Sequence, residues 1–144
     1  TPAHCSSLGK AILATWPPEE LEAFILRYPL PVHTAHTIRT QERFRQELAT
    51  VRKRGFAIDN EEYEEGLKCI GAPVRNFTGA AVAAISIAGP AGRMDNSRLP
   101  GLARLVVETA RQFSATLGYR RDRRNMVEPE PPGVLPSLKG VPHA

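Results

Sequence analysis

The sequence predicts an α+β domain in which helices flank an antiparallel sheet. Three stretches with apolar residues at helical spacing come first, and three short β-like runs and one further helical stretch follow them. Only a short turn separates the last two β-like runs, which makes them antiparallel neighbours. A length of 144 residues suits one domain, and a hydrophobic content of 42% is enough for a core.

The first two helices are predicted from capping residues and prolines. We expect a helix over residues 6–16, because Ser6 and Ser7 are good N-cap residues and Pro17 stops the helix. Pro18 suits the first turn of a second helix, since the nitrogen of proline needs no hydrogen-bond partner there. The apolar face of the second helix comprises Leu21, Phe24, Ile25 and Tyr28.

A third helix is expected between Thr40, as its N-cap, and Gly55, as the residue after its end. Its buried stripe comprises Phe44, Leu48 and Val51. Strands are expected at 56–60, 69–75 and 80–88, with residues 76–79 as the turn of a hairpin. The last run is apolar on both phases, so we expect both of its faces to be covered.

A fourth helix is expected to begin after Asn96 or Ser97 and to end at Gly118. Its apolar stripe comprises Leu99, Leu102, Val106, Ala110, Phe113 and Leu117. Residues 120–144 are charged and then proline-rich, without periodicity, and we expect them to form a flexible basic tail. Three strands are few for this much helix, so part of the sheet is expected to be missing before residue 1.

Charge and cysteine usage bound the function. The formal charge is +4, but Arg120, Arg121, Arg123 and Arg124 lie in the expected tail, and the remainder is about neutral, which disfavours a nucleic-acid-binding surface on the domain itself. The sequence has no membrane-spanning run and no signal-peptide pattern, so a cytoplasmic location is expected. Two cysteines do not make a disulfide framework and fit a reducing compartment, although spacing alone leaves one bridge open.

Four blocks in register carry a family resemblance. They are HCSSLGKAILA at 4–14, T-x-x-T-I at 34–38, VRKRGFAIDNEEYEEGLKCIGAPV at 51–74 and G-x-x-x-A-A-I-S-I at 79–87. The match runs from about residue 4 to residue 118, and the blocks resemble the effector-binding domain of the IclR family of bacterial transcription regulators. The resemblance implies a GAF-like fold over residues 1–119 that binds a small organic or aromatic acid, without a cofactor, in a homo-oligomer (a dimer or a tetramer). It also implies that DNA is bound by an N-terminal winged helix-turn-helix domain, which this chain lacks.

The resemblance implies effector contacts from three segments. The positions that match the family's contacts are Ser7, Leu8, Gly9, Asp59, Cys69, Ser86 and Ala88. Ser7 also opens a helix, whose free N–H groups favour an anion, although the serines of this segment could serve only as caps. Family members often carry a serine where Ala88 stands, so the resemblance implies a smaller or less polar effector here.

Asp59 constrains the chemistry of such an effector. It lies in the acidic run Asp59 to Glu62, which otherwise reads as a solvated turn. Because a carboxylate repels a carboxylate, Asp59 should accept a hydrogen bond from an effector hydroxyl or be protonated. A hydroxy acid, a hydrated keto acid or a phenol is therefore favoured over a plain carboxylate.

Four other interpretations compete with a sensor. Ser7-x-x-Lys10 fits the S-x-x-K pattern of serine acyl-transfer enzymes and hydrolases, but the partner motifs of that class are missing. Cys69 could be a nucleophile, yet no histidine is obviously placed as its base. His33-x-x-His36 is weak evidence for a metal site, so none is expected. A pure oligomerisation module with a filled pocket is the remaining alternative.

Overall fold

A computed structural model describes residues 1–121 of the chain. Its elements, in chain order, are the 3-10 turn η1 (Ala3–Cys5), α1 (Ser7–Leu13), α2 (Pro18–Arg27), α3 (Gln41–Arg54), β1 (Ala57–Asn60), β2 (Leu67–Arg75), β3 (Ala81–Pro90), the 3-10 turn η2 (Ala91–Arg93) and α4 (Leu99–Thr116). The fold is α+β, as predicted. The expected tail falls almost entirely beyond residue 121 and lies outside the described residues.

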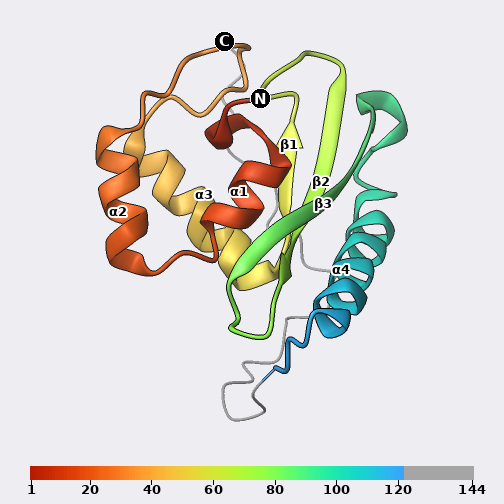
Figure 1. Cartoon of the computed structure of the whole chain (residues 1–144). Helices are drawn as coiled ribbons and strands as arrows, with labels where there is room; N and C mark the ends of the chain where they lie inside the picture. The colour runs from red at the N-terminus through yellow and green to blue at the C-terminus, as the bar shows by residue number, and fades with distance from the viewer. Residues whose placement is uncertain (122–144) are drawn as a thin grey trace.

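The sheet separates two helical layers (Figure 1). Its strand order is β1-β2-β3, and both neighbouring pairs are antiparallel. Helix α4 packs on one face, whereas α1 lies on the other face and packs in turn against α3. Within residues 1–121, no helix is long and apolar enough to cross a bilayer.

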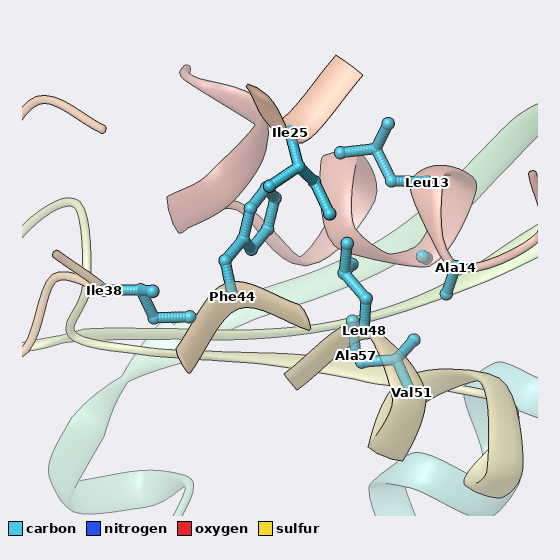
Figure 2. Close-up of a cluster of buried hydrophobic side chains, with 9 residues drawn as sticks. Leu13, Ala14, Ile25, Ile38, Phe44, Leu48, Val51 and Ala57 are labelled. Atoms are coloured by element: carbon cyan, nitrogen blue, oxygen red, sulfur yellow. The ribbon is translucent and has the colours of Figure 1, made fainter. Parts of the chain in front are cut away.

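The α3 layer confirms the expected stripe. Phe44, Leu48 and Val51 are all buried, and they pack with residues of α1, α2 and β1, as Figure 2 shows. Local capping fixes the ends of α3: the Thr40 hydroxyl accepts the N–H of Arg43, and Gly55 adopts a left-handed φ of 86°. Both caps agree with the prediction.

The buried face of α4 differs from the predicted stripe. Leu99, Val106 and Ala110 are buried as expected, but Phe113 is 55% exposed and Leu117 is 44% exposed. The residues that face the sheet are Leu99, Ala103, Val106, Ala110 and Ser114. The stripe predicted from hydrophobicity was wrong at this end of α4, because Ser114 can be buried once its hydroxyl has hydrogen-bond partners. That hydroxyl donates to the carbonyl of Ala110 and accepts the N–H of Arg75.

Helix α1 is shorter than the expected 6–16. Ser6 is its N-cap, and the Ser6 hydroxyl accepts the N–H of Gly9 at 3.0 Å. The helix ends at Leu13. Just beyond it, the guanidinium of Arg52 donates hydrogen bonds to the carbonyls of Ala14 and Trp16. A partner on α3 therefore satisfies carbonyls at the end of α1, a stop that Pro17 does not explain.

Strand β3 corrects a second expectation. Its residues are half-buried or exposed and none is fully buried, so its two apolar phases are not both covered within the described residues. β3 pairs only with β2 there, which leaves it at the edge of the sheet. The prediction of further strands outside this chain remains a prediction.

Candidate functional site

The strand register gathers most of the predicted effector residues on one face of the sheet. Asp59 of β1 is opposite Cys69 of β2, and Cys69 is opposite Ala88 of β3. The next row on the same face pairs Gly71 with Ser86, because alternate residues of a strand share a face. Four candidates from three strands thus form two adjacent rows.

The start of α1 lies directly over the second row. A Cβ atom built on Gly71 would come within 2.9 Å of the backbone carbon and oxygen of Ser7. Only glycine allows this approach, because real Cβ atoms essentially never come so close to backbone atoms. Ser7 is buried here, and Gly71 is the register partner of Ser86, so both serines belong to the same end of the face.

The other two candidates of α1 differ from Ser7. The Leu8 side chain is 41% exposed. Close packing against η1 requires glycine at position 9. A Cβ on Gly9 would lie 2.6 Å from the Cα and the carbonyl oxygen of Ala3, so glycine lets η1 fold back on α1. A groove of about 380 Å³ lies between α2 and α3, away from all seven candidates.

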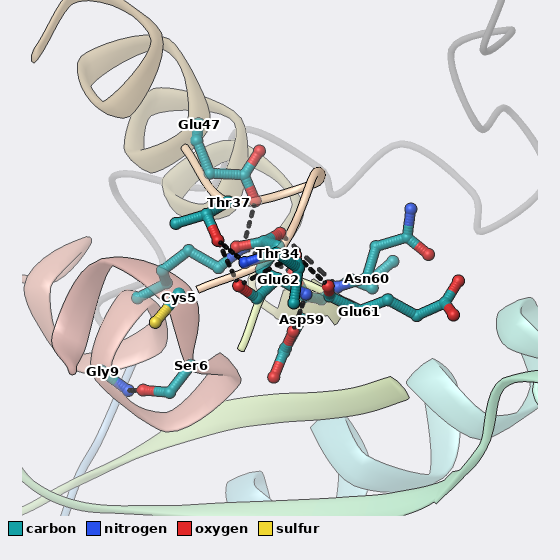
Figure 3. Close-up of polar contacts among 12 residues, drawn as sticks. Cys5, Ser6, Gly9, Thr34, Thr37, Glu47, Asp59, Asn60, Glu61 and Glu62 are labelled. Atoms are coloured by element: carbon teal, nitrogen blue, oxygen red, sulfur yellow. Dashed lines mark hydrogen bonds and ion pairs between the residues drawn. The ribbon is translucent and has the colours of Figure 1, made fainter. Parts of the chain in front are cut away.

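Asp59 is the electrostatic centre of the face. Its side chain is buried, and its Oδ1 accepts the N–H of Glu62 at 2.9 Å, as Figure 3 shows. Burial raises the pKa of Asp59 above its ordinary value, although hydrogen bonds from the following backbone and the charge of Lys10 act in the opposite direction. A carboxyl in this position is suited to sharing a proton with a bound hydroxyl.

Sequence reasoning considered Lys10 only as a possible base for Ser7 and missed its buried ion pairs. Its side chain is 0% exposed, and its ammonium donates to Glu47 Oε1 at 3.0 Å, to Glu62 Oε1 at 2.8 Å and to the carbonyl of Ile58 at 2.5 Å. The one available signal was a lysine inside an otherwise apolar helix, followed by Ala11, Ile12 and Leu13. A lysine in such a place needs a buried partner.

The position of Glu62 argues against the alternative in which the acidic run is a solvated turn. Its side chain is buried against Lys10, and its backbone carbonyl accepts the hydroxyl of Thr37 at 2.6 Å. Thr34 donates to the carbonyl of Glu61 at 2.6 Å, and Glu61 itself has a left-handed φ of 58°. The T-x-x-T block therefore holds an unusual turn in place, a role that its spacing alone did not reveal.

The contacts do not support the catalytic alternatives. The Lys10 ammonium donates to two carboxylates and a carbonyl, so it is held as a cation and not as a base for Ser7. Burial raises the pKa of the Cys69 thiol, and the charge of Asp59 raises it further, whereas a nucleophilic cysteine needs the opposite shift. Residues 1–121 contain no group of three or more His, Cys, Asp or Glu side chains placed to hold a metal ion.

Comparison with known proteins agrees with this architecture. The family model for the bacterial transcriptional regulator IclR C-terminal region matches residues 1–115. The HTH-type transcriptional regulator BhcR of Paracoccus denitrificans is 37% identical over 119 residues, which cover 83% of this chain and 43% of BhcR. The chain thus spans less than half the length of this curated relative.

Two solved structures share the fold. The IclR protein of Thermotoga maritima has a TM-score of 0.80 and 34% identity, and the match covers 83% of this chain and 48% of that one. A double mutant of the PobR inducer-binding domain from Acinetobacter, in complex with 3-hydroxybenzoic acid, has a TM-score of 0.73 and 30% identity, covering 79% and 66%. The chain described here belongs to the family of C-terminal, ligand-binding domains of IclR-type bacterial transcriptional regulators.

Proposed function

We propose that this domain senses a small organic acid and carries out no chemistry on it. The effector lies against the face formed by Asp59, Cys69, Ser86 and Ala88, with Ser7, Leu8 and Gly9 at its α1 end. The single observation that supports this site is the strand register, which aligns residues from three strands beneath one helix start. The raised pKa of the Cys69 thiol favours binding over catalysis, because a nucleophilic cysteine needs a lowered pKa.

The chemistry of this face selects the effector class. Asp59 accepts the N–H of Glu62 through Oδ1, and an ionised carboxylate has further lone pairs with which to accept a hydroxyl proton. A hydroxy acid, a hydrated keto acid or a phenolic acid supplies such a hydroxyl, whereas a second bare carboxylate at this place is repelled. The PobR domain in complex with 3-hydroxybenzoic acid is a structural relative of this chain and supports a ligand of that kind.

Regulation requires parts beyond this domain. In our proposal residues 1–119 are the effector domain, DNA is bound by an N-terminal domain outside this chain, and the protein acts in the cytoplasm as a dimer or tetramer. The effector changes operator affinity only to the extent that it binds the two conformations of the regulator differently.

A thermal-shift screen tests the proposal. The chain is heated with 3-hydroxybenzoate and with a panel of short 2-hydroxy and 2-oxo acids. A binder at 100 times its Kd raises the free energy of unfolding by about 2.7 kcal/mol. The same acid is recovered unchanged after incubation, since no turnover is expected.

A matched pair of variants locates the site. Ser86→Leu places a large side chain on the α1 face of β3 and should abolish the shift in melting temperature. Ala83→Leu places the same side chain on the opposite face of the same strand, where Ala83 is exposed, and should leave the shift intact. The proposal is wrong if no acid stabilises the chain, or if Ser86→Leu responds to the effector as the wild type does.

A further inference from the structure

Two parts of the chain hold the turn between β1 and β2. It follows Asp59, and residues 61 and 62 carry most of its contacts. Thr34 and Thr37 donate to the backbone carbonyls of Glu61 and Glu62 from the segment before α3. Lys10 reaches the Glu62 carboxylate from α1, with distances of 2.8 and 3.0 Å to its two oxygens.

Lys10 also contacts the chain on the other side of Asp59. Its ammonium donates to the carbonyl of Ile58 at 2.5 Å, and that carbonyl belongs to the peptide group that leads into Asp59. On the far side, Glu62 bonds to Lys10 through its carboxylate and to the Asp59 carboxylate through its N–H. One buried ammonium therefore fixes both the backbone before Asp59 and the group that orients its side chain.

The same ammonium connects this turn to α3. Glu47 of α3 lies 3.0 Å from Lys10 Nζ, and Arg54 at the end of α3 lies 3.7 Å from the same Glu47 oxygen. An ion pair that served only the stability of α1 would need one carboxylate. The second carboxylate and the carbonyl instead bring α1, α3 and the turn to a single point.

We infer that Lys10 is a positioning residue for the effector site: it holds Asp59 in place through Ile58 and Glu62, and it ties that position to helix α3. The inference rests on the proposed function only in assigning Asp59 to the effector site. A ligand that displaces Asp59 therefore also shifts the position of Glu47 of α3, because both residues depend on the same buried cation.

Hydrogen exchange of the 144-residue chain tests this without a ligand. The amides of Glu61 and Glu62 report on the turn, and those of Val106 and Ala110 in the middle of α4 report on global opening. Lys10→Met leaves the buried Glu62 carboxylate without the cation that it contacts, whereas Glu47 keeps Arg54, and should speed exchange of the turn amides by about 100-fold or more relative to the α4 amides. Equal acceleration of both sets would reduce Lys10 to a general stabiliser and overturn the inference.

A second variant decides the matter if Lys10→Met does not fold. Glu62→Gln keeps the shape and the threonine contacts of the turn but weakens its link to Lys10, and should speed exchange of the turn amides by roughly tenfold. Unchanged turn amides in Glu62→Gln would overturn the inference. Glu22→Gln removes the partner of Arg45 in the α2–α3 ion pair and should leave the turn unchanged.

The pH titration of Asp59, followed by NMR at its carboxyl carbon, is a further test. A loss of stability alone does not change the midpoint of this titration. Lys10 lowers the pKa of Asp59, so its removal should raise the midpoint of the Asp59 titration, whereas Glu22→Gln should not. A midpoint that is the same in wild type and Lys10→Met would contradict the positioning role. If no acid binds, the proposed function is wrong. The role of Lys10 is still tested in that case, because the hydrogen-exchange and titration experiments need no ligand.

Discussion

Gly71→Ala is the sharpest test of how α1 is seated on the sheet. The added methyl group would lie 2.9 Å from the backbone carbon and oxygen of Ser7 and 3.1 Å from its Cβ. Ordinary van der Waals contact begins at 3.4 Å, so α1 must move by about half an ångström or the β2 backbone must yield. The clash involves backbone atoms, and no flexible side chain can swing away to relieve it.

We expect the clash to lower the free energy of unfolding by about 1 to 3 kcal/mol, the usual range for overpacking of an interior. For a domain of this size the melting temperature then falls by roughly 4 °C or more, measured by circular dichroism during heating. Effector binding should weaken as well, since Ser7 moves relative to Ser86.

Gly101→Ala is the matched control. Gly101 lies in the first turn of α4, and a Cβ built there meets nothing within 4 Å. Alanine favours a helix over glycine by about 1 kcal/mol, so this variant should be as stable as the wild type or more stable. A Gly71→Ala protein that melts within 1 °C of the wild type, in the same experiment, would refute the argument that α1 contacts the sheet through this glycine.

Two further predictions concern the α3 core and the buried histidine. Leu48→Ala should lower the free energy of unfolding by about 2 to 5 kcal/mol, because Leu48 is buried in the packed α3 layer, whereas Leu26→Ala on the exposed side of α2 should change it by less than about 0.5 kcal/mol in a urea titration. Comparable losses in the two variants would contradict the assignment of this core. His4 is fully buried, with Nε2 3.0 Å from the carbonyl of Pro31, and burial lowers the pKa of His4 below its ordinary 6.5. Its neutral form is therefore favoured by folding, and the stability it contributes is present above pH 6.5 and is lost as the pH falls through the lower folded pKa. Between pH 7 and pH 5 the wild type should lose stability relative to His4→Phe in the same titration, and a constant difference between the two proteins across this range would rule out His4 as the cause.

Local signals predicted the regular elements well. Thr40 and Gly55 bound α3 as expected, and the Asn76–Gly79 turn joins β2 to β3, with the N–H of Gly79 bonded to the carbonyl of Asn76. Such features are fixed by residues a few positions apart, so their chemistry can be read from the sequence. The resemblance carried by four separate blocks identified the family for the same reason, since order and spacing are properties of the chain alone.

Only the tertiary structure decided which side chains are inside. Phe113 is exposed and Ser114 is buried, because Arg75 of the neighbouring strand satisfies the serine. Lys10 and Glu62 are 52 positions apart, and neither spacing nor hydropathy links them before α1 packs on the sheet. A charge in an interior depends on partners brought there by folding, whereas a helix cap depends on its own turn, so the chain alone determined the elements and their packing determined the site.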